Sequence, residues 1–141
     1  MTDTKKPFRI LIVDDEESLR EILTIMLHRE GYRVDAAADG AQALTHLKEH
    51  PYDLVISDIV MAGEMNGIEL AHAVREKMPH LPILLVTGYS DQLGAAEAGF
   101  TVLRKPYRLV ELNRAIAKAI LDGDGTPPKN VVKLRTSRRP E

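Results

Sequence analysis

The sequence predicts an open, doubly wound α/β fold, in which a five-stranded parallel sheet carries helices on both faces. Two observations predict this class. Short apolar runs alternate with segments of helical spacing between residues 8 and 121, and short links join them. Several runs also end in acidic or polar residues, which gather at one edge because parallel strands finish on the same side of a sheet. Folds of this kind bind ligands beyond that edge, where the strand order reverses.

Five runs have the length and apolar content of buried strands. The first, Phe8 to Val13, is followed at once by Asp14-Asp15-Glu16. The run that starts at Asp53 ends in Asp58. The others are residues 32–37, residues 81–86 before Thr87, and residues 100–104 before Lys105 and Pro106.

Helical spacing follows the first two strands. The first helix should begin at an N-cap provided by Asp15 and stop at Gly31. Its predicted inner face consists of Leu19, Ile22, Leu23, Met26 and Leu27. The second helix should begin at Asp39 and end before Pro51.

Three further helices are predicted downstream. Gly67 opens one that stops at Pro79, with an inner face of Ile68, Ala71, Val74 and Met78. The last runs from about residue 107 to residue 121, with Leu109, Leu112, Ile116 and Ile120 inward. Between residues 90 and 99 the single large apolar anchor is Leu93, and Gly94 interrupts the pattern. We expect this fourth helix to be short or mobile.

The composition fits one domain of ordinary size. A chain of 141 residues can bury a core without cross-links, and 19 basic against 21 acidic residues leave a net charge of −2. That charge gives no overall attraction to nucleic acid or an anionic membrane. Cysteine is absent, which excludes disulfides and thiolate chemistry. Without a signal peptide or a stretch of ~20 apolar residues, we expect a soluble cytoplasmic protein with no membrane partner.

Three segments organise the chain: a lead over residues 1–7, the domain over residues 8–121, and a tail over residues 122–141. The tail starts with a breaker rich in glycine and proline and continues as a basic segment. We expect it to be disordered. Alternatively, it docks on a partner or on nucleic acid, with Val131-Val132-Lys133-Leu134 adding as a strand to a partner's sheet.

The polar edge predicts a site for a divalent cation and a phosphoryl group. Asp14, Asp15 and Asp58 should lie close together, and such carboxylates raise one another's pKa unless a cation compensates. Mg²⁺ is suitable because it takes oxygen ligands and keeps positions for phosphate oxygens. One carboxylate can then act as a nucleophile and form an acyl phosphate. Thr87 can donate to a phosphoryl oxygen, and Lys105 can pair with another.

These residues resemble the receiver domain of two-component response regulators, a flavodoxin-like fold, over residues 8 to about 121. The motifs occur in the family's order and with fitting spacing: Ile10-Leu11-Ile12-Val13-Asp14-Asp15-Glu16, Asp53-Leu54-Val55-Ile56-Ser57-Asp58, Met65-Asn66-Gly67, Thr87-Gly88 and Lys105-Pro106. The resemblance implies that Asp58 accepts phosphate from a sensor histidine kinase or a histidine phosphotransfer protein. The variant most resembles receivers attached to hybrid histidine kinases and some stand-alone ones.

The resemblance also implies a role for each of the other site residues. Asp15 would bind Mg²⁺ directly, Asp14 through water or in support, and the carbonyl of Val60 would complete the protein ligands. Thr87 would swing toward the new phosphate, and Lys105, turned into the site by a cis peptide bond to the next residue, would pair with it.

The chain departs from the family pattern at several places, among them Ala62, which stands where a proline is common, and Gly63-Glu64, which lengthen the loop after Asp58. Val102 stands where the family usually carries an aromatic switch residue. The interval from Thr87 to Lys105 is shorter than expected by ~4 residues, about one helical turn. This shortening removes surface from the face that many receivers use to dimerise.

The leading functional hypothesis is a phosphoacceptor that catalyses its own phosphorylation and dephosphorylation and signals to an unknown downstream protein. We do not expect a DNA-binding module, because the 20 residues after Leu121 cannot build one. The alternative is a Mg²⁺-dependent phosphatase or phosphotransferase that acts on a small substrate with Asp58 or Asp14 as nucleophile. A flavodoxin-like cofactor binder is disfavoured, since Asp14-Asp15-Glu16 replaces a glycine-rich phosphate loop.

Overall fold

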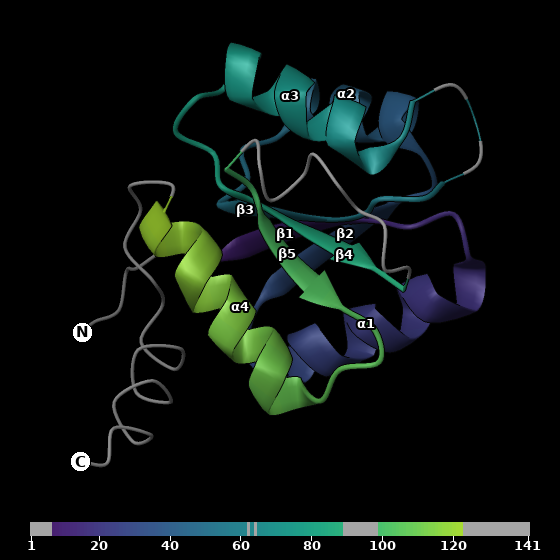
Figure 1. Cartoon of the computed structure of the whole chain (residues 1–141), viewed down its shortest axis with the longest axis vertical. Coiled ribbons are helices and arrows are strands. Elements are labelled where there is room, and N and C mark those ends of the chain that lie inside the picture. The colour runs from purple at the N-terminus through teal and green to yellow at the C-terminus, as the bar shows by residue number, and fades with distance from the viewer. Residues whose placement is uncertain (1–6, 62, 64, 89–98, 123–141) are drawn as a thin grey trace.

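A computed structural model describes residues 7–61, 63, 65–88 and 99–122. Five parallel strands form one sheet in the order β2-β1-β3-β4-β5 (Figure 1). They are β1 (Arg9–Val13), β2 (Arg33–Ala37), β3 (Leu54–Asp58), β4 (Ile83–Thr87) and β5 (Thr101–Arg104). The order reverses between β1 and β3, so the predicted doubly wound topology is confirmed, and its switch point lies between the strands that lead into Asp14 and Asp58.

Helices cover both faces of this sheet. α1 (Glu17–Arg29) and α4 (Leu109–Asp122) lie on one face, and α2 (Gly40–Glu49) and α3 (Gly67–Lys77) lie on the other (Figure 1). Because successive side chains of a strand point to opposite faces, Ile10 and Ile12 of β1 join the first core and Leu11 and Val13 the second. Both cores hold the central strands rigidly behind the polar edge.

Several predicted helix ends are confirmed. Asp39 caps α2 by accepting a hydrogen bond from the backbone of Gln42. Asn66 and Glu69 form a capping box at the start of α3, which satisfies two otherwise unpaired backbone N–H groups. Gly31, with φ of 99°, follows α1 in a conformation that favours glycine.

Three local predictions are wrong. The N-cap of α1 is Glu16 rather than Asp15. Ile22 is 54% exposed, because the buried stripe of α1 follows Leu23 and Leu27, four residues apart, and Ile22 lies to one side of it. Leu109 is also exposed, since it is the first residue of α4 and precedes the turn that packs on the sheet.

No helix in the described part of the chain is long and apolar enough to cross a membrane. The predicted short helix between residues 90 and 99, the lead up to residue 6 and the tail after Asp122 lie outside the described residues.

Candidate functional site

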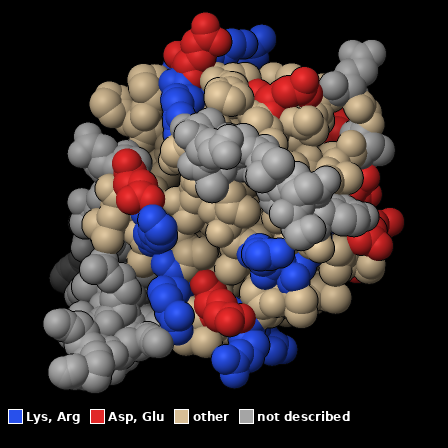
Figure 2. All heavy atoms as spheres, viewed as in Figure 1, with Lys and Arg blue, Asp and Glu red and all other residues tan. Residues whose placement is uncertain are grey.

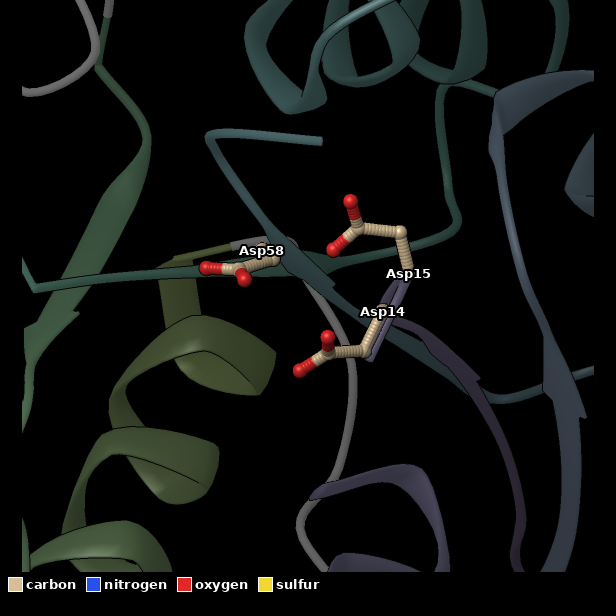
Figure 3. Close-up of side chains that lie close together, drawn as sticks. All are labelled: Asp14, Asp15 and Asp58. Atoms are coloured by element: carbon tan, nitrogen blue, oxygen red, sulfur yellow. The ribbon is translucent and has the colours of Figure 1, made fainter. Parts of the chain in front are cut away.

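Three carboxylates meet at the C-terminal edge of the sheet, as the sequence predicts. Asp14 follows β1 directly, Asp15 is next to it, and Asp58 is the last residue of the central strand β3. Each contributes an oxygen atom, and these atoms all lie within 4.8 Å of one another. The three side chains project to the same side of the ribbon (Figure 3). Asp14 is buried, Asp15 is exposed and Asp58 lies between these extremes, so the cluster opens to solvent on one side.

The turn from β1 into α1 holds Asp14 in place. Its backbone N–H donates to the carbonyl of Ala37 at 3.1 Å, and its Oδ1 accepts from the N–H of Glu16 at 2.9 Å. Arg20, one turn into α1, donates from Nη1 to the carbonyl of Asp14 at 2.8 Å. Sequence reasoning did not find Arg20. Its position in the first turns of α1, shortly after an acidic pair, was the signal that could have pointed to it.

A close backbone contact positions Asp58. The N–H of Gly67 donates to the carbonyl of Ile59 at 2.8 Å, which brings the start of α3 against the end of β3. A Cβ on Gly67 would lie 2.1 Å from the carbonyl oxygen of Asp58. This contact explains physically why glycine opens α3: any side chain would push the helix away from the strand that carries Asp58.

Lys105 and Thr87 complete the edge on the other side of Asp58. The N–H of Lys105 donates to the carbonyl of Thr87 at 2.7 Å, which joins the ends of β4 and β5. Its Nζ lies 3.3 Å from Oδ2 of Asp58. The bond from Lys105 to Pro106 is cis, in agreement with the expectation. Thr87 is buried at the end of β4, so both predicted residues belong to the same edge.

The electrostatics of Asp58 favour a bound cation. Burial is the main effect and raises its pKa to about 6, and the charges of Asp14 and Asp15 act in the same direction against the ammonium of Lys105. Burial also raises the pKa of Tyr107, with further contributions from the charges of Asp14 and Asp58. This half-buried ring packs against the α1 and α4 core and senses the same negative field, a role that sequence reasoning did not assign to it.

The donor set fits Mg²⁺. The ion prefers oxygen ligands and is commonly held by one or two carboxylates, with water or phosphate oxygens in its other positions. Three convergent carboxylates supply the ligands, and Lys105 compensates their negative charge only in part. Val60, two residues after Asp58, is 54% exposed, so its side chain is turned to solvent rather than into the core.

Phe100, the aromatic residue two positions before Val102, is buried in the α2 and α3 core. Val102 of β5 and Phe100, which immediately precedes that strand, both pack against the α2 and α3 core. Phe100 is buried, with the guanidinium of Arg75 3.8 Å above its ring and His72 against its edge. This aromatic side chain fastens α3 to the beginning of β5, at the opposite end of the strand from Lys105.

Comparisons with known proteins find similar chains over most of this sequence. The response regulator receiver domain model matches residues 10–117. The receiver protein CpdR of Brucella abortus is 37% identical over 80% of this chain and 97% of its own length. The structure of TrrA from Thermotoga maritima in complex with Mg²⁺-BeF superposes with a TM-score of 0.72 at 38% identity, covering 79% of this chain and 98% of that one.

A longer relative matches as well. The DNA-binding response regulator MtrA of Mycobacterium tuberculosis is 36% identical over 84% of this chain. This chain spans 53% of MtrA, about half its length. The match over residues 10–117 and the 97% coverage of CpdR show that the chain belongs to the response regulator receiver domain family of two-component signalling, whose members act as phosphoacceptors.

Proposed function

We propose that Asp58 is the residue of this receiver that accepts the phosphoryl group, and that Asp14, Asp15 and Asp58 hold the Mg²⁺ required for the transfer. The observation that carries the proposal is the convergence of three carboxylates with Lys105 3.3 Å from Asp58. When bound, Mg²⁺ would neutralise negative charge on the transferring group. The backbone carbonyl of Val60 is the proposed fourth protein ligand.

In the proposed reaction, a carboxylate oxygen of Asp58 attacks the phosphorus of a phosphohistidine on a partner protein. The N–P bond breaks, its electron pair returns to the imidazole, and an acyl O–P bond forms. Lys105 pairs with a phosphoryl oxygen, and the hydroxyl of Thr87 donates to another. Because Asp58 is ionised above a pKa of about 6, the nucleophilic carboxylate is present at neutral pH.

A protein phosphodonor is consistent with the surface beside this edge. Receiver domains interact with histidine kinases or phosphotransfer proteins. Here Ile22 and Ile25 of α1 are both 54% exposed on a helix that begins shortly after Asp14. Exposed apolar side chains on a helix that leads away from the reactive edge are suited to docking a partner helix. We therefore assign the donor role to a sensor histidine kinase or a histidine phosphotransfer protein.

We also propose that the domain catalyses its own phosphorylation and dephosphorylation and does not turn over an external substrate. DNA binding is a property of MtrA, a protein about twice as long as the matched segment, and we do not extend it to this chain. The alternative, a Mg²⁺-dependent phosphatase or phosphotransferase, predicts repeated release of product from a small substrate.

The test is intact mass spectrometry after incubation with Mg²⁺ and acetyl phosphate. We expect the parent protein to gain one phosphate and Asp58→Asn to gain none, because an amide cannot form the acyl phosphate. Asp35→Asn is the matched control, since it makes the same chemical change at another carboxylate and should still be labelled. Labelling of Asp58→Asn, or labelling that persists in EDTA, would contradict the proposal. Many equivalents of phosphate released without any labelled protein would instead support the enzyme alternative.

A further inference from the structure

Asp14 is held on three sides, which leaves one of its carboxylate oxygens to face the acidic cluster. Its N–H donates to the carbonyl of Ala37, its Oδ1 accepts from the N–H of Glu16, and its carbonyl accepts from Nη1 of Arg20. Among the described residues, Oδ2 is the one polar atom of Asp14 without a hydrogen-bond partner. The first two contacts come from the backbone, so Arg20 is the one side chain that holds this turn.

Arg20 reaches back to the site instead of pairing with its helix neighbours. It is half-buried in the first turns of α1, and its Nη1 lies 2.8 Å from the carbonyl oxygen of Asp14. Glu17, three residues earlier on the same helix face, would be an ordinary partner. Yet no salt bridge joins Arg20 to a carboxylate in the described part of the chain. The guanidinium leans toward the start of its helix, as helical side chains do, and meets the turn before α1.

The charge of Arg20 is unfavourable for the helix that carries it. The first turns of a helix present partial positive charge, which repels a cation. A residue that opposes the local preference commonly serves a site instead of the helix. On the face shown in Figure 2, basic and acidic side chains are interspersed, so individual contacts matter more there than a potential of one sign. The contact that Arg20 makes is with the backbone of Asp14, and the cation that pairs with Asp58 is Lys105.

This backbone contact also fixes Asp15. The carbonyl of Asp14 and the N–H of Asp15 belong to one planar peptide unit, so a group that holds this carbonyl sets the orientation of the whole unit. The orientation of the unit in turn sets the direction in which the side chain of Asp15 leaves the turn. Asp14 and Asp15 point to the same side of the ribbon as Asp58 (Figure 3). Arg20 therefore acts on two of the three clustered carboxylates through one hydrogen bond.

Rigidity of such a turn matters because divalent cations differ in what they tolerate. Mg²⁺ requires a nearly octahedral set of oxygens at about 2.0–2.1 Å, whereas Ca²⁺ accepts irregular sets at about 2.3–2.6 Å. A site with few protein oxygens therefore discriminates between these ions by how firmly its oxygens are held. Removing a group that orients metal ligands commonly lowers metal affinity about ten- to a hundredfold.

We propose that Arg20 is a positioning residue that gives the cation site its preference for Mg²⁺ over Ca²⁺, by holding the peptide between Asp14 and Asp15. In this role Arg20 contacts neither the cation nor the phosphoryl group. The inference rests on the proposed function, because it requires that the three carboxylates hold Mg²⁺.

The test is isothermal titration calorimetry of the full chain with MgCl₂ and, separately, with CaCl₂. Arg20→Met removes the donor and the charge but keeps an apolar stem. We expect it to weaken Mg²⁺ binding about tenfold and Ca²⁺ binding about twofold at most. Arg20→Lys keeps a donor and the charge and should lie between the parent and Arg20→Met. Arg29→Met, the matched control, removes the same charge from the last turn of the same helix and should leave both affinities nearly unchanged.

Loss of charge alone predicts the opposite sign, since both ions should bind more tightly once a repelling cation is removed. Unchanged or tighter Mg²⁺ binding in Arg20→Met would therefore overturn the inference. Equal losses for the two ions, or an equal loss in Arg29→Met, would overturn it as well. Arg20→Gln, which removes the charge and shortens the donor, is the second variant and should show the same loss of preference.

Failure of this inference and failure of the proposed function give different results. A parent protein that binds Mg²⁺ and gains one phosphate from acetyl phosphate, alongside an Arg20→Met variant with the parent's preference between the ions, would overturn only the role of Arg20. A parent protein that does not bind Mg²⁺ would overturn the proposed cation site and the role of Arg20 with it.

Discussion

Two carboxylates of this domain, Asp58 and Asp35, show opposite electrostatic behaviour. Asp35 of β2 accepts hydrogen bonds from the hydroxyl of Tyr52 at 2.6 Å and from Nη2 of Arg9 at 3.2 Å. The bond from Tyr52 is the main reason that its pKa is lowered, and Arg9 adds to the effect. The pKa of Asp58 is raised to about 6, mainly by burial, although Lys105 lies 3.3 Å away.

The difference follows from position in the sheet. Asp35 lies on the edge strand β2, where its side chain is 40% exposed and two donors reach it. Asp58 ends the central strand β3, where its side chain is 12% exposed and shares the edge with two other carboxylates. A carboxylate whose charge is compensated by fixed donors stabilises the fold. A carboxylate left under-compensated fits the proposed role of Asp58, which is to receive a cation and a phosphoryl group.

The largest expected effect on stability comes from a substitution at Gly67, whose backbone lies against that of Asp58. Gly67→Ala should lower the free energy of unfolding by about 3 kcal/mol, because its Cβ would overlap the carbonyl of Asp58 and force α3 away from β3. Urea unfolding measures this loss. Gly88→Ala is the control, since its Cβ would meet Lys105 only at ordinary contact distance, 3.9 Å. Similar losses in both variants would show that the contact of Gly67 is not special.

The next effect tests the raised pKa of Asp58. In the parent, the folded state keeps a proton on Asp58 up to about pH 6, whereas the unfolded state releases it near the ordinary value of 3.8. Stability therefore falls as the pH rises through this window, and the loss is complete above it. Asp58→Asn cannot ionise, so in EDTA at neutral pH it should be more stable than the parent by about 2 kcal/mol.

Thermal or urea unfolding across the pH range checks this prediction. The gain should shrink as the pH falls from 6 and vanish well below 3.8, where the parent carboxyl is protonated in both states. Mg²⁺ should reduce the gain at neutral pH by stabilising the parent. A variant less stable than the parent at neutral pH would show that Lys105 already compensates the charge of Asp58.

The smallest effect concerns the compensated carboxylate. Asp35→Asn should lower the free energy of unfolding at neutral pH by about 1 kcal/mol, a value reduced for the partial exposure of the side chain. Because its folded pKa is lowered, the stabilisation by Asp35 is present above the ordinary value of 3.8 and is lost as the pH falls through the folded value. The difference from the parent should therefore vanish in acid. Equal stability at neutral pH would remove the distinction between the two carboxylates.

The sequence predicted well which polar side chains meet at the carboxyl edge of the sheet, because strand direction and chain order suffice to locate them. Asp14, Asp58 and Lys105 each follow an apolar run, and parallel strands end together whatever the helices do. Side-chain orientation on the helices was predicted less well. Ile22 fits an apolar helical pattern yet is exposed, because the angle at which α1 docks selects which part of the pattern is buried. Leu109 fits the pattern of α4 but is the first residue of that helix, ahead of the turn that packs on the sheet.

By itself, the sequence determined the strand and helix order, the carboxylates that meet and the lysine beside them, because these follow from periodicity and from the common direction of parallel strands. Only the tertiary structure decided that Gly67 contacts the backbone of Asp58 and that Arg20 holds the carbonyl of Asp14. The reason is that these features join residues far apart in the chain or depend on how helices pack. The local sequence pattern carries no information on such long-range contacts or on helix packing until the sheet and its helices are assembled.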